Sequence, residues 1–598
     1  VAVSKGTPNM DRPQQTAPLT FSAPSYALTF LADRPFVYVD DQAGARLLEL
    51  CVLSSVHPLQ GRDDTVRVGV WDVDQRPDET VYSLSVGSSV WDEKIYRFRC
   101  QPHRFRYEIE VCGQGHLADI LYFGGYVSAY QRWGSGLLVS GHHFARGFNP
   151  EPIAEETHEF DPASTVHIDL AGVPLPGKGD WFFTPPPYCL ALQGAHGWVG
   201  LGVEAQAGAN RWTEYTYHGG RGFHLSLAYE GYTVVDGAYT LPAIGFDFAP
   251  DPLAVLRKHV QALRTVGLVP HMDDGPRPAW WYEPIYCGWG TQCYHAAIAG
   301  GRAPDYARQS HYAAWLGTLA EHGVEPGIVV IDDKWQRTYG NNEVDADRWP
   351  DLPGFVAAQH AAGKKVLLWL KAWDHEGLPP DECILNAGGL PLTADPTNPA
   401  YERRLRAAVR RMLSPDGYNA DGFKIDFTAR IPGGPGMRLY GNLWGLELMK
   451  QLLHIIHDEA KRTKADALVI THTPHPYFAD VVDMLRLNDT LELERLSDPR
   501  IGRNIGATMA LRAQIAALAC PGVPIDTDNW PVRDRTAWRE YMRLQPDLGV
   551  PALYFASHID RTQEPLEAED YALIRETWAR YRAALAADAG TTPSKERR

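Results

Sequence analysis

The chain has 598 residues, which is too long for one ordinary domain, and 44% hydrophobic with 22% charged residues is the composition of a folded globular protein. Its 57 basic against 73 acidic side chains give a net charge of −16, and no run of five or more basic residues occurs, so we expect no nucleic-acid partner. No apolar stretch approaches the roughly 18 residues of a membrane span, so we expect no membrane partner either.

The 8 cysteines are scattered and form no Cys-x-x-Cys pair, which suits a reducing compartment. The residues from Val1 to Arg12 are polar and lack a secretory pattern. These features predict a cytoplasmic protein. The first residue, Val1, leaves open that the native start, and with it a removed signal, is missing.

Residues 1–250 are expected to form an antiparallel β-sandwich. Their regular segments are short, alternating and rich in β-branched or aromatic residues, as in 65–71 and 104–111. Turn clusters such as 61–64 separate them, and helical periodicity is nearly absent. This domain is expected to bind carbohydrate or to brace its neighbour.

Residues 251–270 are predicted to form a linker helix, which begins at Asp251-Pro252 and ends at Gly267 and Pro270. From 271 to 598, strands and helices alternate, and eight strands with about eight helices predict a catalytic (β/α)8 barrel with a C-terminal helix and a polar tail. A doubly wound sheet is the competing fold, but the chain has no Gly-rich phosphate turn. The expected strands are 284–289, 327–331, 365–370, 422–427, 467–471, 482–487, 523–526 and 552–555.

In such a barrel, reactive side chains follow the carboxyl ends of the strands. The residues found there are mostly carboxylates, Lys, Arg and Trp. Lys424 and Asp426 are two residues apart and therefore share a face of the fourth strand. Acids, cations and flat aromatic rings together favour a sugar site, and two of the carboxyls could serve as the nucleophile and the acid/base of a retaining glycosidase.

Taken in order, six segments resemble the strand-end motifs of retaining α-galactosidases of glycoside hydrolase family 36, and most closely its raffinose-synthase-like branch. They are Tyr286-Cys287-Gly288-Trp289-Gly290-Thr291, Ile331-Asp332-Asp333-Lys334-Trp335-Gln336, Leu368-Trp369-Leu370-Lys371-Ala372-Trp373, Phe423-Lys424-Ile425-Asp426-Phe427, Arg486-Leu487-Asn488-Asp489 and Cys520-Pro521-Gly522-Val523-Pro524-Ile525-Asp526-Thr527-Asp528. The resemblance spans about 281–528, and the family also carries a preceding β-sandwich.

The resemblance implies that Asp426 is the catalytic nucleophile and Asp489 the acid/base. It further implies a set of substrate-binding residues: Asp332 and Asp333 for the 4- and 6-hydroxyls, Lys424 and Arg486 for other hydroxyls, Trp289, Trp369 and Trp373 as walls, and Asp528 as a further acid. The chain departs from the family pattern at Gly290, Lys334 and Asn488, which leaves the exact sugar open.

We therefore expect a retaining exo-α-glycosidase, most specifically an α-galactosidase, that acts on an oligosaccharide or glycoside and needs no cofactor. His472, His475 and the pair His142-His143 lack a convincing third ligand, so no metal is expected. Three alternatives stay open: an α-galactosyl transferase, an α-glucosidase on the same scaffold, and a non-catalytic carbohydrate-binding protein. The aglycone is not determined, and a homo-oligomer is possible.

Overall fold

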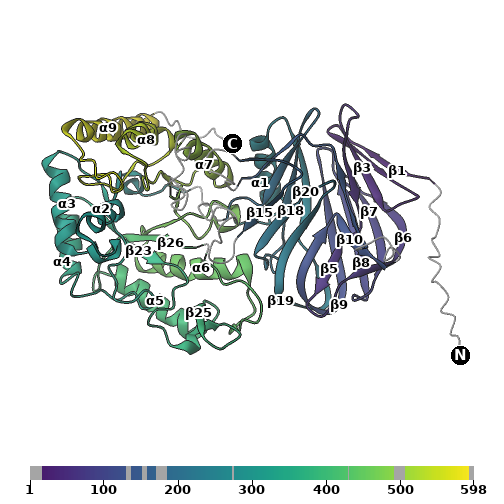
Figure 1. Cartoon of the computed structure of the whole chain (residues 1–598), viewed down its shortest axis with the longest axis horizontal. Coiled ribbons are helices and arrows are strands. Elements are labelled where there is room, and N and C mark those ends of the chain that lie inside the picture. Colours follow the sequence, from purple (N-terminus) through teal and green to yellow (C-terminus); the bar gives the residue numbers. More distant parts are fainter. Residues whose placement is uncertain are drawn as a thin grey trace.

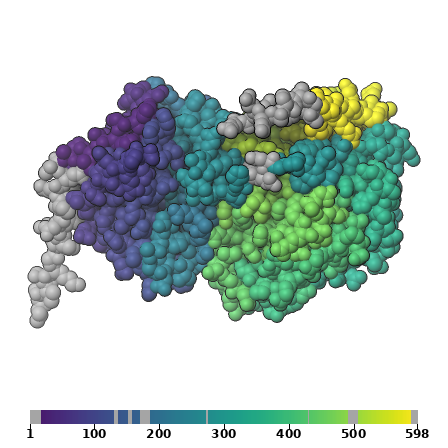
Figure 2. Space-filling model, turned by 180° about the vertical axis from the view of Figure 1, so that it is seen from behind, coloured from purple at the N-terminus to yellow at the C-terminus, as the bar shows by residue number. Residues whose placement is uncertain are grey.

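The computed structural model describes residues 17–128, 136–150, 158–169, 185–271, 275–428, 430–489 and 505–590. The chain forms two lobes side by side, one built from β-sheets and one from strands that alternate with helices (Figures 1 and 2). Among the described helices, none is long and apolar enough to cross a membrane.

The N-terminal lobe contains two large sheets whose strands pair antiparallel, apart from the parallel pair β6 and β10. The five-stranded sheet has the order β1 (Leu19–Ser22), β2 (Tyr26–Phe30), β3 (Phe36–Asp41), β4 (Arg46–Cys51) and β12 (Gly141–His142). The path of the larger sheet is β11 (Leu137–Val139), β10 (Gly124–Val127), β6 (Asp64–Gln75), β7 (Thr80–Ser88), β8 (Glu93–Cys100), β9 (Arg104–Tyr122), β20 (Ala243–Ala249), β17 (Gly197–Glu204), β16 (Cys189–Gly194), β13 (Arg146–Phe148) and β14 (Glu159–Phe160). Off this path lie β5 (Ser55–Pro58), β15 (Thr165–Asp169), β18 (Glu214–His218) and β19 (His224–Thr240).

The alternating sequence of these strands explains the two-layered packing. In β8, every second side chain from Lys94 to Cys100 is fully buried. Aromatic rings join the layers, with the ring of Phe30 on β2 5.4 Å from that of Phe98 on β8. The predicted antiparallel β-sandwich is confirmed.

Helix α1 (Pro252–Thr265) connects the lobes. The carboxylate of Asp251 caps it by accepting the Ala254 N–H at 2.8 Å, and Pro252 occupies its first turn. Its apolar face, which includes Val255 and Leu256, packs on β17 and β20, and the helix also contacts α7.

The second lobe is a nearly closed barrel of eight parallel strands, as the alternating pattern predicts. In order around the sheet they are β29 (Ile525–Asp526), β28 (Met484–Arg486), β27 (Leu468–Thr471), β26 (Gly422–Asp426), β23 (Lys365–Lys371), β22 (Ile328–Ile331), β21 (Ile285–Cys287) and β30 (Ala552–Leu553). A parallel bridge between Asp526 and Val550 spans the remaining gap between β29 and β30.

Helices surround this barrel (Figure 1). They are α2 (Trp289–Ala299), α3 (Gln309–Glu321), α4 (Leu352–Ala361), α5 (Pro399–Leu413), α6 (Gly445–Thr463), α7 (Ile505–Ala519), α8 (Arg535–Leu548) and α9 (Ala568–Gly590). A small antiparallel pair, β24 (Cys383–Leu385) and β25 (Pro391–Ala394), precedes α5 and is not expected from the sequence.

Candidate active site

The strand ends of the barrel bring the predicted acids and cations together. Asp426 and Arg486 are the last residues of β26 and β28, and Asp332 and Asp528 follow β22 and β29 within two residues. The carboxyl ends of parallel strands share one mouth of a barrel. The side chains therefore meet although they lie far apart in sequence.

The guanidinium of Arg486 joins three of the carboxyls. Its Nη2 donates to Asp426 Oδ1 at 2.8 Å, and its Nη1 donates to Asp528 Oδ2 at 2.8 Å. The same Nη1 lies 3.7 Å from Asp489 Oδ1. The Arg486 side chain is only 2% exposed, whereas Asp426 and Asp489 keep 18% and 14% exposure. The two predicted catalytic carboxyls thus face one buried cation and stay accessible.

Lys424 forms a second buried cluster on the neighbouring side. Its Nζ donates to Asp332 Oδ2 at 2.8 Å and lies 3.4 Å from the Cys287 sulfur. The thiol of Cys287 donates to the same Asp332 oxygen at 3.0 Å. Burial opposes the charged form of Lys424, but Asp332, Cys287 and Asp426 together outweigh burial, and the pKa of Lys424 is raised. This cluster fixes the orientation of Asp332.

Two hydrogen bonds hold the carboxylate of Asp426, and an imidazole lies close to it. The backbone N–H of Phe427 donates to Oδ1 at 2.9 Å, and the indole N–H of Trp369 donates to Oδ2 at 3.3 Å. The Nε2 of His472 lies 3.7 Å from Oδ1 and hydrogen-bonds the Thr428 hydroxyl at 3.1 Å. Asp426 therefore has a fixed rotamer at the end of its strand.

The two catalytic candidates differ in pKa because their surroundings differ. Burial would raise the pKa of Asp426, but the charges of Arg486 and Lys424 outweigh it, and its pKa lies below the usual range. At Asp489, burial is the largest effect and raises the pKa. The carboxylates of Asp528 and Asp426 raise it further, the charge of Arg486 lowers it, and the resulting pKa is about 8. At neutral pH, Asp426 is ionised and Asp489 is mostly protonated.

Backbone strain also concentrates at the strand ends. Among the described residues, four non-glycine positions with positive φ follow barrel strands: Trp373 (68°), Phe427 (60°), Asn488 (65°) and Asp528 (55°). Such conformations cost about 1–3 kcal/mol each and occur where the surrounding structure enforces them, often at functional sites. The turn at Phe427 places its N–H against the Asp426 carboxylate.

Aromatic rings and cations lie beside Asp426. The rings of Tyr339 and Phe427 contact that of Trp369 edge-on, at 5.9 and 6.2 Å between centres. Lys371 Nζ lies 4.2 Å from the centre of the Tyr339 ring. The Tyr339 hydroxyl donates to Asp333 Oδ1 at 2.7 Å. Burial raises the pKa of Asp333 to about 7 although this bond and nearby lysines lower it.

Two predicted wall residues lie away from this network. Trp373 is 3% exposed, and its indole N–H donates to the carbonyl of Thr428 at 2.8 Å. Trp289 is half-buried and packs edge-on against Trp530, with 5.8 Å between ring centres. In the described part of the chain neither indole hydrogen-bonds Asp426 or Asp489, so both remain predictions as walls of a sugar site.

Sequence reasoning missed two members of the site. Cys287 has no role in the site that the sequence predicts, and His472 enters that prediction only as a rejected metal ligand. Both positions carried a signal, because Cys287 ends β21 and His472 directly follows β27. Strand-end position alone would have placed them at the mouth.

The β-sandwich supports the segment that follows Asp426. The Tyr232 hydroxyl on β19 donates to the Gly434 carbonyl at 2.7 Å and accepts the Met437 N–H at 2.9 Å. The Tyr232 ring packs on that of Trp444, with 3.9 Å between centres. Of the two roles expected for this lobe, these contacts fit bracing.

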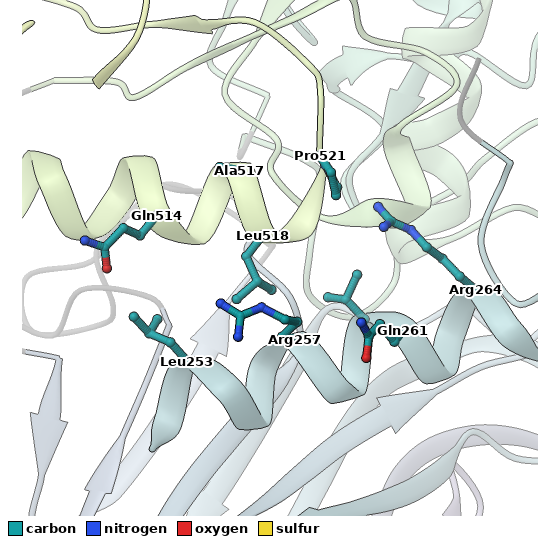
Figure 3. A pocket seen from close by; sticks show the side chains of 9 residues that line it. Leu253, Arg257, Gln261, Arg264, Gln514, Ala517, Leu518 and Pro521 are labelled. Atoms are coloured by element: carbon teal, nitrogen blue, oxygen red, sulfur yellow. The ribbon is translucent and has the colours of Figure 1, made fainter. Parts of the chain in front are cut away.

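A groove of about 470 Å³ lies elsewhere, between α1 and α7 (Figure 3). Its lining is largely apolar, with Arg257 and Arg264 at its side. None of the predicted site residues lines it.

One group of potential metal ligands exists among the described residues, and it lies in the β-sandwich lobe. Glu204, Asp247 and His259 have ligand atoms within 4.8 Å of one another. The Arg104 guanidinium already donates to both carboxylates, at 2.9 Å to Asp247. The arginine thus supplies the positive charge of this cluster.

No family model matches the chain, and no curated protein matches its sequence. Solved structures share its fold. A family 31 sulfoquinovosidase from E. rectale, bound to an aza-sugar inhibitor, is 12% identical, with a TM-score of 0.57 over 94% of this chain and 82% of that one. An α-galactosidase from Thermus thermophilus, bound to p-nitrophenyl α-D-galactopyranoside, is 16% identical, with a TM-score of 0.51 over 86% and 95%.

A family 31 dextranase from Flavobacterium johnsoniae, bound to glucose, is 10% identical, with a TM-score of 0.53 over 96% and 69%. The chain therefore shares the fold of these three enzymes. The similarity includes family 31 enzymes as well as an α-galactosidase and does not single out family 36.

Proposed function

We propose that the chain is a retaining exo-α-glycosidase that hydrolyses terminal α-galactosides by double displacement. The observation that carries the proposal is the pair of carboxyls Asp426 and Asp489, which share the cation of Arg486 but have pKa values displaced in opposite directions. A retaining glycosidase needs one ionised and one protonated carboxyl at the same site.

In the first step, the Asp426 carboxylate attacks the anomeric carbon while Asp489 transfers its proton to the leaving oxygen. The product is a β-linked glycosyl ester of Asp426. In the second step, Asp489 is a carboxylate and removes a proton from water, which attacks the same carbon and releases Asp426. The hydrogen bonds from Trp369 and Phe427 hold the Asp426 carboxylate in place for both steps.

The solved structures with this fold support the class of reaction, since they include a sulfoquinovosidase, an α-galactosidase and a dextranase. The galactoside assignment rests on the motif resemblance, with Asp332 and Asp333 holding the 4- and 6-hydroxyls. Lys424 holds Asp332 in one orientation for this role.

The test is hydrolysis of p-nitrophenyl α- and β-glycosides by the wild type and by Asp426→Ala, with and without azide. We expect release from the α-galactoside, loss of activity in the variant, and rescue by azide with formation of β-galactosyl azide. Activity only on another α-glycoside would contradict the galactoside assignment but agree with the proposed mechanism. No release from any glycoside would contradict the proposed function.

A further inference from the structure

Arg430 lies next to the proposed nucleophile but takes no part in the mechanism above. It follows Asp426 by four residues, and its backbone N–H donates to the Phe427 carbonyl at 2.9 Å. Its guanidinium carbon lies 4.0 Å from the centre of the Phe427 ring. Because Phe427 also donates its N–H to the Asp426 carboxylate, this turn fixes the guanidinium beside the catalytic centre.

Arg430 differs from the neighbouring cations because no carboxylate lies within ion-pair distance of it in the described part of the chain. Lys334 pairs with Glu376 at 2.6 Å, and Lys371 pairs with Asp374 at 2.7 Å.

The more deeply buried cations are paired as well: Arg486 and Lys424 each contact a carboxylate at 2.8 Å. The Nε of Arg430 is buried and has no hydrogen-bond partner.

The half-buried position of Arg430 has an electrostatic consequence. Burial lowers its pKa, although the charges of Asp426 and Asp374 act in the opposite direction. A guanidinium held partly out of water without a counter-ion is unfavourable, and an anionic ligand would relieve this cost. The planar fork of arginine suits two-point binding of carboxylate, sulfonate or phosphate oxygens.

We infer that the glycoside hydrolysed at this site carries an anionic group and that Arg430 binds it. The inference rests on the proposed α-glycosidase activity and names a chemical class of substrate within it. The acid can be carried by the terminal sugar, as in a sulfate ester of a hydroxyl other than the 4- and 6-hydroxyls, or by the leaving group, as in a glycosylglycerol phosphate.

The experiment compares acidic and neutral members of two matched pairs. The first pair is p-nitrophenyl 3-O-sulfo-α-galactoside and p-nitrophenyl α-galactoside, and the second is α-galactosylglycerol phosphate and α-galactosylglycerol. Binding is measured by calorimetry on Asp426→Asn, which keeps ligands intact, and kcat/KM is measured on the wild type. Each measurement is repeated with Arg430→Gln, with Arg430→Lys and with the control Arg337→Gln, which alters an exposed arginine.

We expect one acidic compound to bind about 10- to 100-fold more tightly than its neutral partner, as for hydrogen bonds to a charged group. Arg430→Gln should abolish this preference, Arg430→Lys should keep part of it, and Arg337→Gln should leave it unchanged. The pair that shows the preference identifies the ring or the leaving group as the source of the acid.

Equal binding of the acidic and neutral compounds in both pairs, or a preference that survives Arg430→Gln, would overturn the inference. The proposed function fails separately. If the wild type hydrolyses neutral α-galactosides without any charge preference, the glycosidase stands and the anion site does not. If Asp426→Asn binds an acidic compound through Arg430 but the wild type cleaves no α-glycoside, the anion site stands and the glycosidase does not.

Discussion

Replacing Arg486 with glutamine should shift both limbs of the pH profile of kcat/KM to higher pH. The guanidinium donates to Asp426 at 2.8 Å and lies 3.7 Å from Asp489, and its charge lowers the pKa of both carboxyls. The acidic limb belongs to Asp426, which must be ionised, and the basic limb belongs to Asp489, which must be protonated. Loss of the cation raises both pKa values, so both limbs move to higher pH.

The size of the pKa shift follows from the distance between the Arg486 guanidinium and the carboxylate. Two unit charges about 4 Å apart interact by roughly 4 kcal/mol at an effective dielectric constant of about 20. One pKa unit corresponds to about 1.4 kcal/mol, which sets an upper value of about 3 units. Lys424 remains beside Asp426 after the substitution. We therefore expect the acidic limb to rise by about 1–3 units.

The assay is hydrolysis of p-nitrophenyl α-galactoside from pH 3 to 10, after thermal unfolding has shown that the variant folds. Arg486→Lys is the second variant, since it keeps one positive charge and should shift the limbs less. The control is Arg404→Gln. Arg404 lies on α5 and donates two hydrogen bonds to Glu382, at 2.6 and 2.8 Å, which the substitution breaks. The basic limb near pH 8 lies inside this range, and a basic limb that stays in place while kcat/KM falls would refute the reasoning.

Two further substitutions test other parts of the site. Asp489→Ala should lower kcat/KM by about 10²–10⁴-fold on glycosides with poor leaving groups, have little effect on kcat/KM for dinitrophenyl glycosides, and remove the basic limb near pH 8. Equal losses of kcat/KM on both substrates would contradict its role as the acid. Tyr232→Phe removes the hydroxyl bonded to the Gly434 carbonyl, so hydrogen exchange in residues 431–440 should increase by about tenfold, equivalent to a net hydrogen bond of about 1.5 kcal/mol. Unchanged exchange there would show that the β-sandwich does not hold this segment.

The order of elements in the barrel was predictable from sequence because each strand is a short apolar run. The predicted strand 365–370 is β23 with one added residue, and the predicted strand 327–331 contains all of β22, Ile328–Ile331. Strand ends were less predictable: the stretch 523–526 contains only a two-residue strand, Ile525–Asp526. Pairing with neighbouring strands sets these ends, and a single sequence does not contain that information.

The acids and cations at the mouth were predictable for the same reason, since they follow apolar strands. Their partners were not. The contact between Cys287 and Lys424 joins positions 137 residues apart, and it depends on the diameter of the closed barrel. The sharing of Arg486 by Asp426 and Asp528 likewise depends on side chains from separate strands, beyond the reach of local periodicity.

The most direct test of the central claim is to trap the glycosyl-enzyme. The wild-type protein is treated with 5-fluoro-α-galactosyl fluoride, and the labelled peptide is sequenced by mass spectrometry. We predict a mass increase of one fluorogalactosyl unit on Asp426, with the label absent from Asp426→Asn. A label on Asp489, Asp332 or any other carboxyl, or turnover of the reagent with inversion at the anomeric carbon, would contradict Asp426 as the nucleophile of a retaining enzyme.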